Sequence, residues 1–331
     1  MNSHFQYEKM PDNTQNWILP VNMTKKNCKN WIVTEKVHGA NFCFVTDGTT
    51  VKPAKRNDFL ETDENKIVDT FFGYKKVFDK YVPNILSLFK DILDSNRFYD
   101  LDTVNVYGEL FGGKYPDVET PQGIEPVQSE ILYCPDLEFY AFDIAIVTLD
   151  AIKIYLDYDL CITLFEKANL FYAQPLLIGS FTEALNYSVD FQSTIPKLLK
   201  LVPPKDNPAE GIVVKPIKTI VIQGKKNKER VIFKRKAEKF NERIASNKFY
   251  TNDNDLIKFL ETFVTKNRYN NLISKNGKNM KDDEIFTKYI EDVLLDAYLD
   301  KIFLSKWNSI TEFEQKNICS KLKLSILNFK K

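Results

Sequence analysis

Apolar and polar residues follow strand-like patterns along most of the first 240 positions. The runs WIVTEKVHGANFCF (31–44) and VKPAKR (51–56) flank the turn pair Asp47-Gly48, which predicts two strands joined by a tight turn. We expect mostly antiparallel sheet, because short β-rich runs follow one another with few long helices between them. The further runs are 104–113, 137–147, 152–159, 210–216, 219–224 and 230–236.

Helical spacing of apolar residues is found between these strands and throughout the tail. Residues 65–93 predict two helices, because Pro83 interrupts the pattern, and shorter helices are predicted at 160–169 and 194–201. Beyond about residue 244 the strand signals end. The tail predicts helices at 255–265, 283–303 and 311–327, separated by a solvated Lys- and Asn-rich loop at 266–281.

These patterns predict two domains of different class. We place the boundary near 244–252, between an α+β domain at 1–245 and a small all-helical domain at 250–331. A content of 44% hydrophobic and 13% aromatic residues in 331 positions is that of a folded chain with a sizeable core. We therefore expect antiparallel sheets with flanking helices in the first domain.

Charge and cysteine content bear on the possible partners and on the cellular compartment. Lys and Arg number 46 and Asp and Glu 45, so any affinity for nucleic acid has to come from local clusters of charge. Five cysteines without a CxxC pair indicate reduced thiols and a cytoplasmic setting. We expect neither export nor membrane insertion, since there is no signal pattern and no apolar run near the roughly 20 residues a bilayer requires. A mitochondrial presequence is not favoured either.

Five segments place charged or aromatic residues within this β framework. Each is weak alone: a lysine on a strand is usually a surface residue with a packed stem, and a phenylalanine between apolar neighbours is usually core. A histidine is usually an incidental polar group. The segments are TEKVHGAN with Lys36 and His38, YGELFGG with Glu109, FYAFDI with Phe142 and Asp143, EGIVVKP with Glu210 and Lys215, and FKRK with Lys234 and Lys236.

In this order and spacing, the segments resemble the nucleotidyltransferase motifs of the covalent ligase and capping-enzyme superfamily. Those motifs are K-x-(H/D)-G, an Arg-containing strand, an acidic strand, an aromatic strand, E-G-x-x-x-K and K-x-K. Histidine in EKVHGANF, with VYGELFGGKYP and AEGIVVKP, resembles the nick-sealing ATP-dependent RNA ligase branch, which includes phage and kinetoplastid RNA-editing ligases. The resemblance covers about 30–243 and implies an ATP-grasp-like nucleotidyltransferase domain. The helical tail is similar in character to that branch's C-terminal domain.

The resemblance implies a covalent AMP adduct on Lys36. A lysine amine is normally protonated at neutral pH and has to lose its proton before it attacks phosphorus, which neighbouring cations favour. Lys215, Lys234 and Lys236 are the candidate cations, and the last two are expected to contact the α-phosphate. Glu210 is expected to hold Mg²⁺, for which Mn²⁺ can substitute.

The resemblance also assigns the nucleotide contacts. Phe142 is expected to stack on adenine and Glu109 to accept the ribose hydroxyl, with Asn41 near the same sugar. The backbone at Glu35 and Val37 is expected to select the adenine edge.

Other residues are expected to contact phosphate or RNA. Arg56 suits bidentate binding of phosphate in the nucleotide site, and it is also predicted to contact RNA together with Lys55, His38 and Asp143. His38 is expected to orient phosphate or to act in the later steps on RNA. The basic run 215–243 is the candidate positive surface.

The implied reaction joins 3′-hydroxyl and 5′-phosphate RNA ends at duplex nicks, through lysyl-AMP and RNA-adenylate, in a monomer without a membrane partner. A GTP-dependent capping guanylyltransferase is an alternative, although the motif histidine and ELFGG disfavour it. No OB-fold pattern follows the last motif, which disfavours a DNA ligase. A catalytically dead RNA-binding homologue is a further alternative, but the motif lysines and carboxylates are all present.

Overall fold

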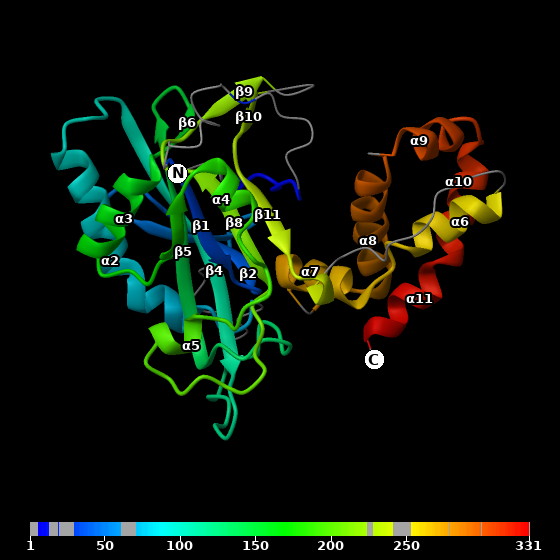
Figure 1. Cartoon of the computed structure of the whole chain (residues 1–331), viewed down its shortest axis with the longest axis horizontal. Coiled ribbons are helices and arrows are strands. Elements are labelled where there is room, and N and C mark those ends of the chain that lie inside the picture. Colours follow the sequence, from blue (N-terminus) through cyan, green and yellow to red (C-terminus); the bar gives the residue numbers. More distant parts are fainter. Residues whose placement is uncertain are drawn as a thin grey trace. The chain divides into compact units, whose positions relative to one another are not determined.

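The computed structural model describes residues 6–12, 19, 30–60, 71–223, 228–240, 253–277, 279–298 and 300–330. The chain forms two compact units, Met1–Ala237 and Glu238–Lys331. The predicted boundary at 244–252 lies outside the described residues. Figure 1 shows the first unit as a mixed sheet and helix body and the second as helices alone.

Two antiparallel sheets form the framework of unit 1, which confirms the predicted α+β class. The larger sheet has the order β3-β2-β4-β5-β6, and the smaller has the order β11-β8-β1-β7. A separate hairpin pairs β9 (Val221–Gln223) with β10 (Lys228–Arg230). The larger sheet contains β2 (Ala40–Thr46), β3 (Val51–Lys55), β4 (Leu101–Lys114), β5 (Cys134–Thr148) and β6 (Lys153–Tyr155). The smaller contains β1 (Trp31–Lys36), β7 (Pro175–Gly179), β8 (Gly211–Pro216) and β11 (Phe233–Lys236).

The chain crosses from one sheet to the other at the first motif. It leaves the smaller sheet after Lys36 and enters the larger sheet at Ala40, so the single strand predicted for 31–44 is wrong. The apolar residues on either side of the motif are buried in different sheets. Gly39 allows the crossing, because a Cβ there would lie 2.2 Å from the carbonyl oxygen of Leu110.

Helix α2 (Lys75–Asp94) covers the outer face of the larger sheet. The Phe78 ring stacks on Phe44 of β2 at 5.6 Å between centroids, and Tyr81 lies against Phe139 of β5. The helix continues through Pro83, so the two helices predicted there are one within the described residues. A proline removes one helical hydrogen bond, and burial of the apolar face of α2 outweighs that loss.

Apolar side chains fill the space between the two sheets. Cys43, Val45 and Tyr107 of the larger sheet form one cluster with Val213 of β8. On the outer face of the smaller sheet, Trp31 packs against Phe181 with ring centroids 4.6 Å apart. The remaining helices of unit 1 are α3 (Tyr158–Lys167), α4 (Phe181–Leu185) and α5 (Ile195–Leu198).

Unit 2 is helical in its described residues, as predicted. None of the helices in the described parts of the chain combines the length and apolarity needed to cross a membrane. The elements are η1 (Glu238–Phe240), α6 (Asp253–Glu261), α7 (Lys266–Asn276), α8 (Asp282–Ala297), α9 (Lys301–Trp307), α10 (Glu312–Lys321), α11 (Lys323–Leu327) and η2 (Asn328–Lys330).

Helix α7 occupies most of the stretch predicted to be a solvated loop, and that prediction is wrong. Arg268 is only 2% exposed, and its guanidinium binds the carboxylates of Asp292 and Asp296 on α8. Tyr269 and Leu272 are buried in the core of unit 2. The segment is mostly polar and its buried Arg268 is charged, so its sequence shows no apolar helical pattern.

Candidate active site

Strand register gathers four lysines on one face of the smaller sheet. Lys36 of β1 and Lys236 of β11 both pair with Gly211 of β8, one on each side. Lys234 precedes Lys236 by two positions, and Lys215 lies two positions from Val213, the partner of Lys234. Residues two apart share a face of a sheet, and Val213 packs in the cluster between the sheets. The lysines therefore share the face that is turned toward the larger sheet.

Glu210 joins two of these lysines. Its Oε2 lies 2.6 Å from Lys36 Nζ and its Oε1 lies 3.2 Å from Lys236 Nζ. The carboxylate is 1% exposed, whereas the Lys36 side chain keeps 16% exposure. Burial acts to raise the pKa of Glu210, but Lys36 and Lys236 outweigh it and lower the pKa to about 2. Glu210 is therefore ionised at neutral pH and orients the two amino groups.

Glu109 approaches the same cluster from the larger sheet. It pairs with Asn41 across β4 and β2, and its Oε1 accepts a hydrogen bond from the Gly39 N–H at 3.2 Å. Burial and the Glu210 carboxylate raise the pKa of Glu109 to about 7, against the opposing effects of Lys36 and Arg56. The crossing at Gly39 thus brings carboxylates of both sheets to one site.

His38 lies within the crossing and is buried. Its backbone N–H donates to the Tyr133 hydroxyl at 2.8 Å, and its ring is close enough to Glu210 and the lysines for their charges to affect it. Burial lowers the pKa of the imidazole, with Glu210 acting in the opposite direction. His38 is therefore neutral at physiological pH. Val37, its neighbour, is also buried.

Glu35 points away from the lysine face. Its carboxylate accepts hydrogen bonds from the Ser193 hydroxyl at 2.6 Å and from the N–H and hydroxyl of Thr194 at 2.8 and 2.6 Å. Burial raises the pKa of Glu35, while these hydrogen bonds oppose the change. The side chain therefore fixes the segment before α5 to the strand that carries Lys36.

Asp143 is the centre of a second, fully buried group. Its carboxylate binds Lys215 Nζ at 2.8 Å, both terminal nitrogens of Arg230 at 2.8 and 3.0 Å, and the Tyr7 hydroxyl. Burial acts to raise the pKa of Asp143, but Arg230 and Lys215 hold it at about 2. Asp143, predicted to contact RNA, is 0% exposed and contacts protein groups instead.

Phe142 lies beside this buried group. Its carbonyl accepts a hydrogen bond from Lys215 Nζ at 2.8 Å, and its ring packs with the cluster that contains Val213. The Tyr7 ring meets it edge to face, with centroids 4.9 Å apart. The aromatic residue of the FYAFDI segment and the lysine face therefore share one space between the sheets.

The segment 6–12 also reaches the site. The Lys234 N–H donates to the Pro11 carbonyl at 3.0 Å, and Lys234 Nζ lies 3.5 Å from the Asp12 carboxylate. Sequence reasoning missed Tyr7, because no motif or periodicity marks it. It also missed Arg230, for which a basic residue next to an apolar strand run was an available signal.

Lys55 and Arg56 lie at the end of β3. Lys55 pairs with Phe42 of β2, and its N–H donates to the Asp58 carbonyl at 2.9 Å. Arg56 follows directly and lowers the pKa of Glu109 by its charge. Arg56 is thus near the carboxylates of the cluster.

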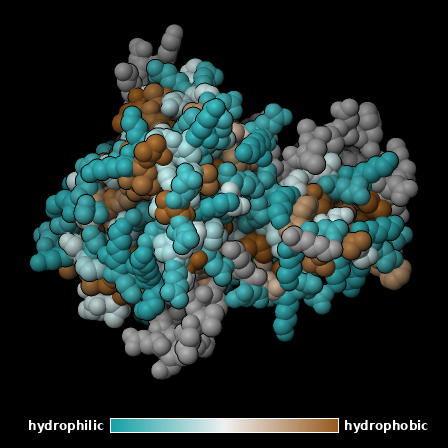
Figure 2. Space-filling view, turned by 90° about the horizontal axis from the view of Figure 1, so that it is seen from below, coloured by the Kyte–Doolittle hydropathy of each residue, from teal (hydrophilic) through white to brown (hydrophobic). Residues whose placement is uncertain are grey.

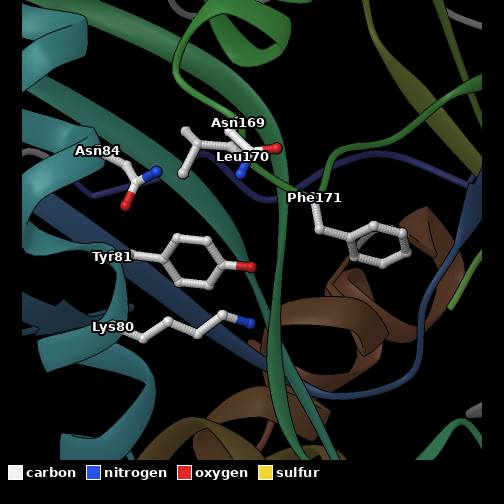
Figure 3. Close-up of a pocket in the computed structure, with 6 residues that line it drawn as sticks. All are labelled: Lys80, Tyr81, Asn84, Asn169, Leu170 and Phe171. Atoms are coloured by element: carbon white, nitrogen blue, oxygen red, sulfur yellow. The ribbon is translucent and has the colours of Figure 1, made fainter.

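A separate pocket lies between α2 and the segment after α3. It has a volume of about 470 Å³ and is lined by Lys80, Tyr81, Asn84, Asn169, Leu170 and Phe171 (Figure 3). Lys80 and Tyr81 both bind the Glu138 carboxylate, at 2.6 and 2.7 Å, and the Asn84 amide donates to the Ala168 carbonyl. Its polar groups thus serve the packing of α2, and the lysine face remains the candidate site.

The carboxylates of the lysine face are the candidate ligands for a divalent cation. No group of three or more His, Cys, Asp or Glu side chains in the described residues has a metal-binding arrangement. The carboxylates of buried Glu210 and half-buried Glu109 repel each other. Magnesium is commonly held by one or two carboxylates together with phosphate oxygens, so these residues fit Mg²⁺ or Mn²⁺ better than a metal such as zinc that prefers His and Cys ligands.

Comparison with known proteins gives one family and several related chains. A family model described as RNA ligase matches residues 29–236. The mitochondrial RNA-editing ligase 2 of Trypanosoma brucei brucei is 36% identical over 206 residues, covering 56% of this chain and 48% of the relative. RNA-editing ligase 1 of the same organism is 32% identical over 221 residues, covering 57% and 45%. The chain therefore spans about half the length of these relatives.

Solved structures with a weaker likeness include an RNA ligase from Naegleria gruberi with PPi. It is 18% identical, the match covers 72% of this chain and 57% of that chain, and the TM-score is 0.40.

Proposed function

Because the chain belongs to the RNA ligase family, we propose that it is an ATP-dependent RNA ligase that forms lysyl-AMP on Lys36. The observation that carries the proposal is the cluster of Lys36, Glu210 and Lys236 on one sheet face, with Lys234 beside it. Lys36 keeps partial exposure while its partner carboxylate is buried, so the amine is oriented and still accessible.

In the first step, Lys36 Nζ attacks the α-phosphorus of ATP. A nitrogen–phosphorus bond forms, the bond to the bridging oxygen breaks, and pyrophosphate leaves. Glu210 orients the amine, which has to give up its proton before attack. Lys234 and Lys236 stabilise negative charge on the α-phosphate as it redistributes.

The nucleotide would lie in the space between the sheets. Phe142 offers the aromatic surface for adenine, and the backbone of Glu35 and Val37 the edge contacts. Glu109 accepts the ribose hydroxyl, with Asn41 as its cross-strand neighbour. We assign Asp143 a structural role: it holds Lys215 and Arg230 beside the Phe142 backbone.

Glu210 and Glu109 would hold Mg²⁺, and Mn²⁺ can replace it. When bound, the ion neutralises charge on the leaving pyrophosphate. A cation beside Glu210 and Glu109 would reduce the repulsion between their carboxylates, which supports this placement.

The second and third steps use RNA. The 5′-phosphate takes AMP from Lys36, and the 3′-hydroxyl then attacks that activated phosphate and releases AMP. Arg56 and Lys55, at the end of β3, would contact phosphate, and the neutral His38 would orient it.

We assign unit 1 as the adenylyltransferase domain and unit 2 as the accompanying helical domain. We propose nicked duplex RNA as the substrate; the trypanosome relatives are named RNA-editing ligases, which supports RNA as the nucleic acid. Those relatives are described as mitochondrial, whereas a cytoplasmic location and a monomeric state remain predictions for this chain.

The function is tested by sealing. Wild type and Lys36→Ala are incubated with a nicked RNA duplex that carries either a 5′-phosphate or a ready-made 5′-adenylate. We expect wild type to seal both, and the variant to seal only the adenylated nick, because Lys36 acts only before RNA-adenylate forms. Sealing of the 5′-phosphate nick by Lys36→Ala would contradict the assignment. Preference for a nicked DNA duplex or for single strands would overturn the choice of substrate.

A further inference from the structure

Helix α5 and the segment that connects it to β8 contain several exposed lysines. We call residues 194–209 the α5 loop. It contains Lys197, Lys200 and Lys205, all exposed, and a single acid, Asp206. In the described part of the chain, none of the three lysines has a carboxylate within ion-pair distance. Their charges are therefore available to a partner.

Several basic residues of the positive surface predicted for residues 215–243 bind other groups of the protein. Lys215 and Arg230 bind buried Asp143. Lys218 pairs with acids at the start of α3, and Arg235 donates to backbone carbonyls near the end of α4. Residues 224–227 and 241–243 lie outside the described part of the chain. The exposed lysines of the α5 loop are therefore a further source of positive charge on unit 1.

Both ends of the α5 loop are fixed at the active site. At its start, Thr194 and the preceding Ser193 bind the Glu35 carboxylate, one residue before Lys36. At its end, Ala209 leads directly into Glu210, which binds Lys36 at 2.6 Å. A ligand held by this loop is therefore held by a segment whose two ends contact the candidate site.

Hydrogen bonds also hold the middle of the loop. The Leu201 N–H donates to the Pro196 carbonyl at 2.8 Å, and the Tyr115 hydroxyl donates to the Val202 carbonyl at 2.6 Å. Asn207 exchanges two hydrogen bonds with the backbone of Leu132, both 2.8 Å long. A surface already held in one conformation loses little entropy when it binds.

The tip of the α5 loop is exposed. Val202, 86% exposed, precedes Pro203-Pro204 and forms an apolar tip between the lysines. In Figure 1, α5 lies in the lower part of unit 1, and Figure 2, viewed from below, shows a mainly hydrophilic surface with scattered hydrophobic patches. The neighbouring segment 115–130 carries four acids and no lysine or arginine, so its charge is opposite to that of the α5 loop.

We propose that the α5 loop binds the phosphate backbone of the RNA duplex beside the nick, through Lys197, Lys200 and Lys205. This inference rests on the proposed function. Phosphates spaced along a backbone match several unpaired ammonium groups on a rigid loop, and the contact requires no particular base sequence. The loop then places the nick in line with Lys36.

The test compares two charge-matched triple variants. One is Lys197→Gln, Lys200→Gln and Lys205→Gln in the α5 loop. The control is Lys75→Gln, Lys90→Gln and Lys167→Gln, exposed lysines of α2 and α3. Affinity for a nicked RNA duplex is measured at several salt concentrations, and lysyl-AMP formation is measured without RNA.

We expect the loop variant to form lysyl-AMP at the wild-type rate and to bind nicked RNA on the order of 10–100-fold more weakly. The slope of log affinity against log salt should fall in magnitude by about 2–3, close to 0.9 for each lost phosphate contact. The control variant should change neither quantity by a comparable amount.

Three results would overturn the inference. The first is unchanged RNA affinity and slope in the loop variant, and the second is an equal loss in both variants, which would indicate net charge alone. The third is loss of lysyl-AMP formation in the loop variant, which would mean that the loop supports the site through Glu35. Binding of an acidic peptide in place of RNA would also overturn it. Wild type that forms lysyl-AMP but does not seal RNA refutes the proposed function separately.

A single substitution tests the same inference if the triple variant does not fold. Lys200 has a left-handed backbone with φ of 60°, which glycine adopts readily. Lys200→Gly removes the charge without strain. It should reproduce about a third of the change in salt slope, whereas no change would count against the proposal.

Discussion

The amino nitrogen of Lys36 lies 2.6 Å from a carboxylate oxygen of Glu210, although 174 positions separate the two residues in the chain. The pairing depends on β1 and β8 lying side by side, with Lys36 opposite Gly211. It also depends on the chain leaving the smaller sheet directly after Lys36. The nucleophile, its carboxylate partner and the crossing to the larger sheet are thus parts of one arrangement.

Removing Glu210 should damage both activity and stability. Glu210→Ala leaves Lys36 and Lys236 without their shared carboxylate in a largely buried setting, and breaking a buried pair in this way costs about 3 kcal/mol. We expect adenylation to fall by at least two orders of magnitude, measured as lysyl-AMP formed per minute, with stability followed by urea unfolding. Glu119→Ala, which removes an exposed acid, is the control and should match wild type. Normal adenylation in Glu210→Ala would exclude the role assigned to this carboxylate.

We expect the protein to lose stability in acid as Asp143 becomes protonated. Its pKa is about 2 in the folded protein, below the ordinary value of about 3.9 in an unfolded chain. The carboxylate therefore contributes stability that is complete above pH ~4 and declines as pH falls toward 2, by about 2–3 kcal/mol in all. The free energy of unfolding of wild type and Asp143→Asn should differ most above pH ~4 and converge toward pH 2. A gap that does not change with pH would show that the ion pairs with Arg230 and Lys215 contribute nothing.

Tyr7 should support the nucleotide site through its ring. Tyr7→Phe keeps the edge contact with Phe142 and loses only the hydroxyl bond to Asp143, so we expect a loss of about 1 kcal/mol in stability and an unchanged KM for ATP. Tyr7→Ala removes the ring, destabilises the protein by about 3–4 kcal/mol and should raise the KM for ATP several-fold. The measurement is the ATP dependence of lysyl-AMP formation. Equal KM values for the two variants would leave Tyr7 with a purely structural role.

Gly39 should tolerate no side chain. In Gly39→Ala the new Cβ would lie 2.2 Å from the Leu110 carbonyl oxygen, so the crossing has to move and Glu109 and Lys36 have to separate. Gly123→Ala is a matched control, because no heavy atom lies within 4 Å of its Cβ and it costs only about 1 kcal/mol of backbone strain. We expect adenylation to fall more than tenfold in Gly39→Ala and to remain normal in Gly123→Ala. The reverse order would contradict the close approach of the two sheets.

Motif order, β-rich runs and the helical tail could be predicted from the sequence because each depends on local pattern. The division of strands between two sheets could not, since the residues around Gly39 read as one continuous apolar strand. Helix α7 was missed because Arg268 is buried only through acids on α8. Tyr7 was missed for a similar reason: its place beside Phe142 and Asp143 depends on contacts more than 130 positions away.

In the candidate site, too, features that depend on local pattern could be predicted and features that depend on distant contacts could not. The motif lysines and Glu210 lie close together because alternate positions of paired strands face one way. The burial of Asp143 could not be read from FYAFDI, since its partners Lys215 and Arg230 belong to other strands. The burial of a charged residue therefore cannot be predicted from a single sequence when its partners lie far away in the chain.

The most direct test is covalent labelling of the protein with nucleotide. Wild type and Lys36→Ala are incubated with Mg²⁺ and either ATP or GTP labelled at the α-phosphate, and label that survives denaturing electrophoresis is measured. The account predicts labelling by ATP alone, its loss in Lys36→Ala, and its loss when Mg²⁺ is chelated. Labelling by GTP would indicate capping chemistry, and labelling of folded Lys36→Ala at the wild-type level would contradict the central assignment of the nucleophile.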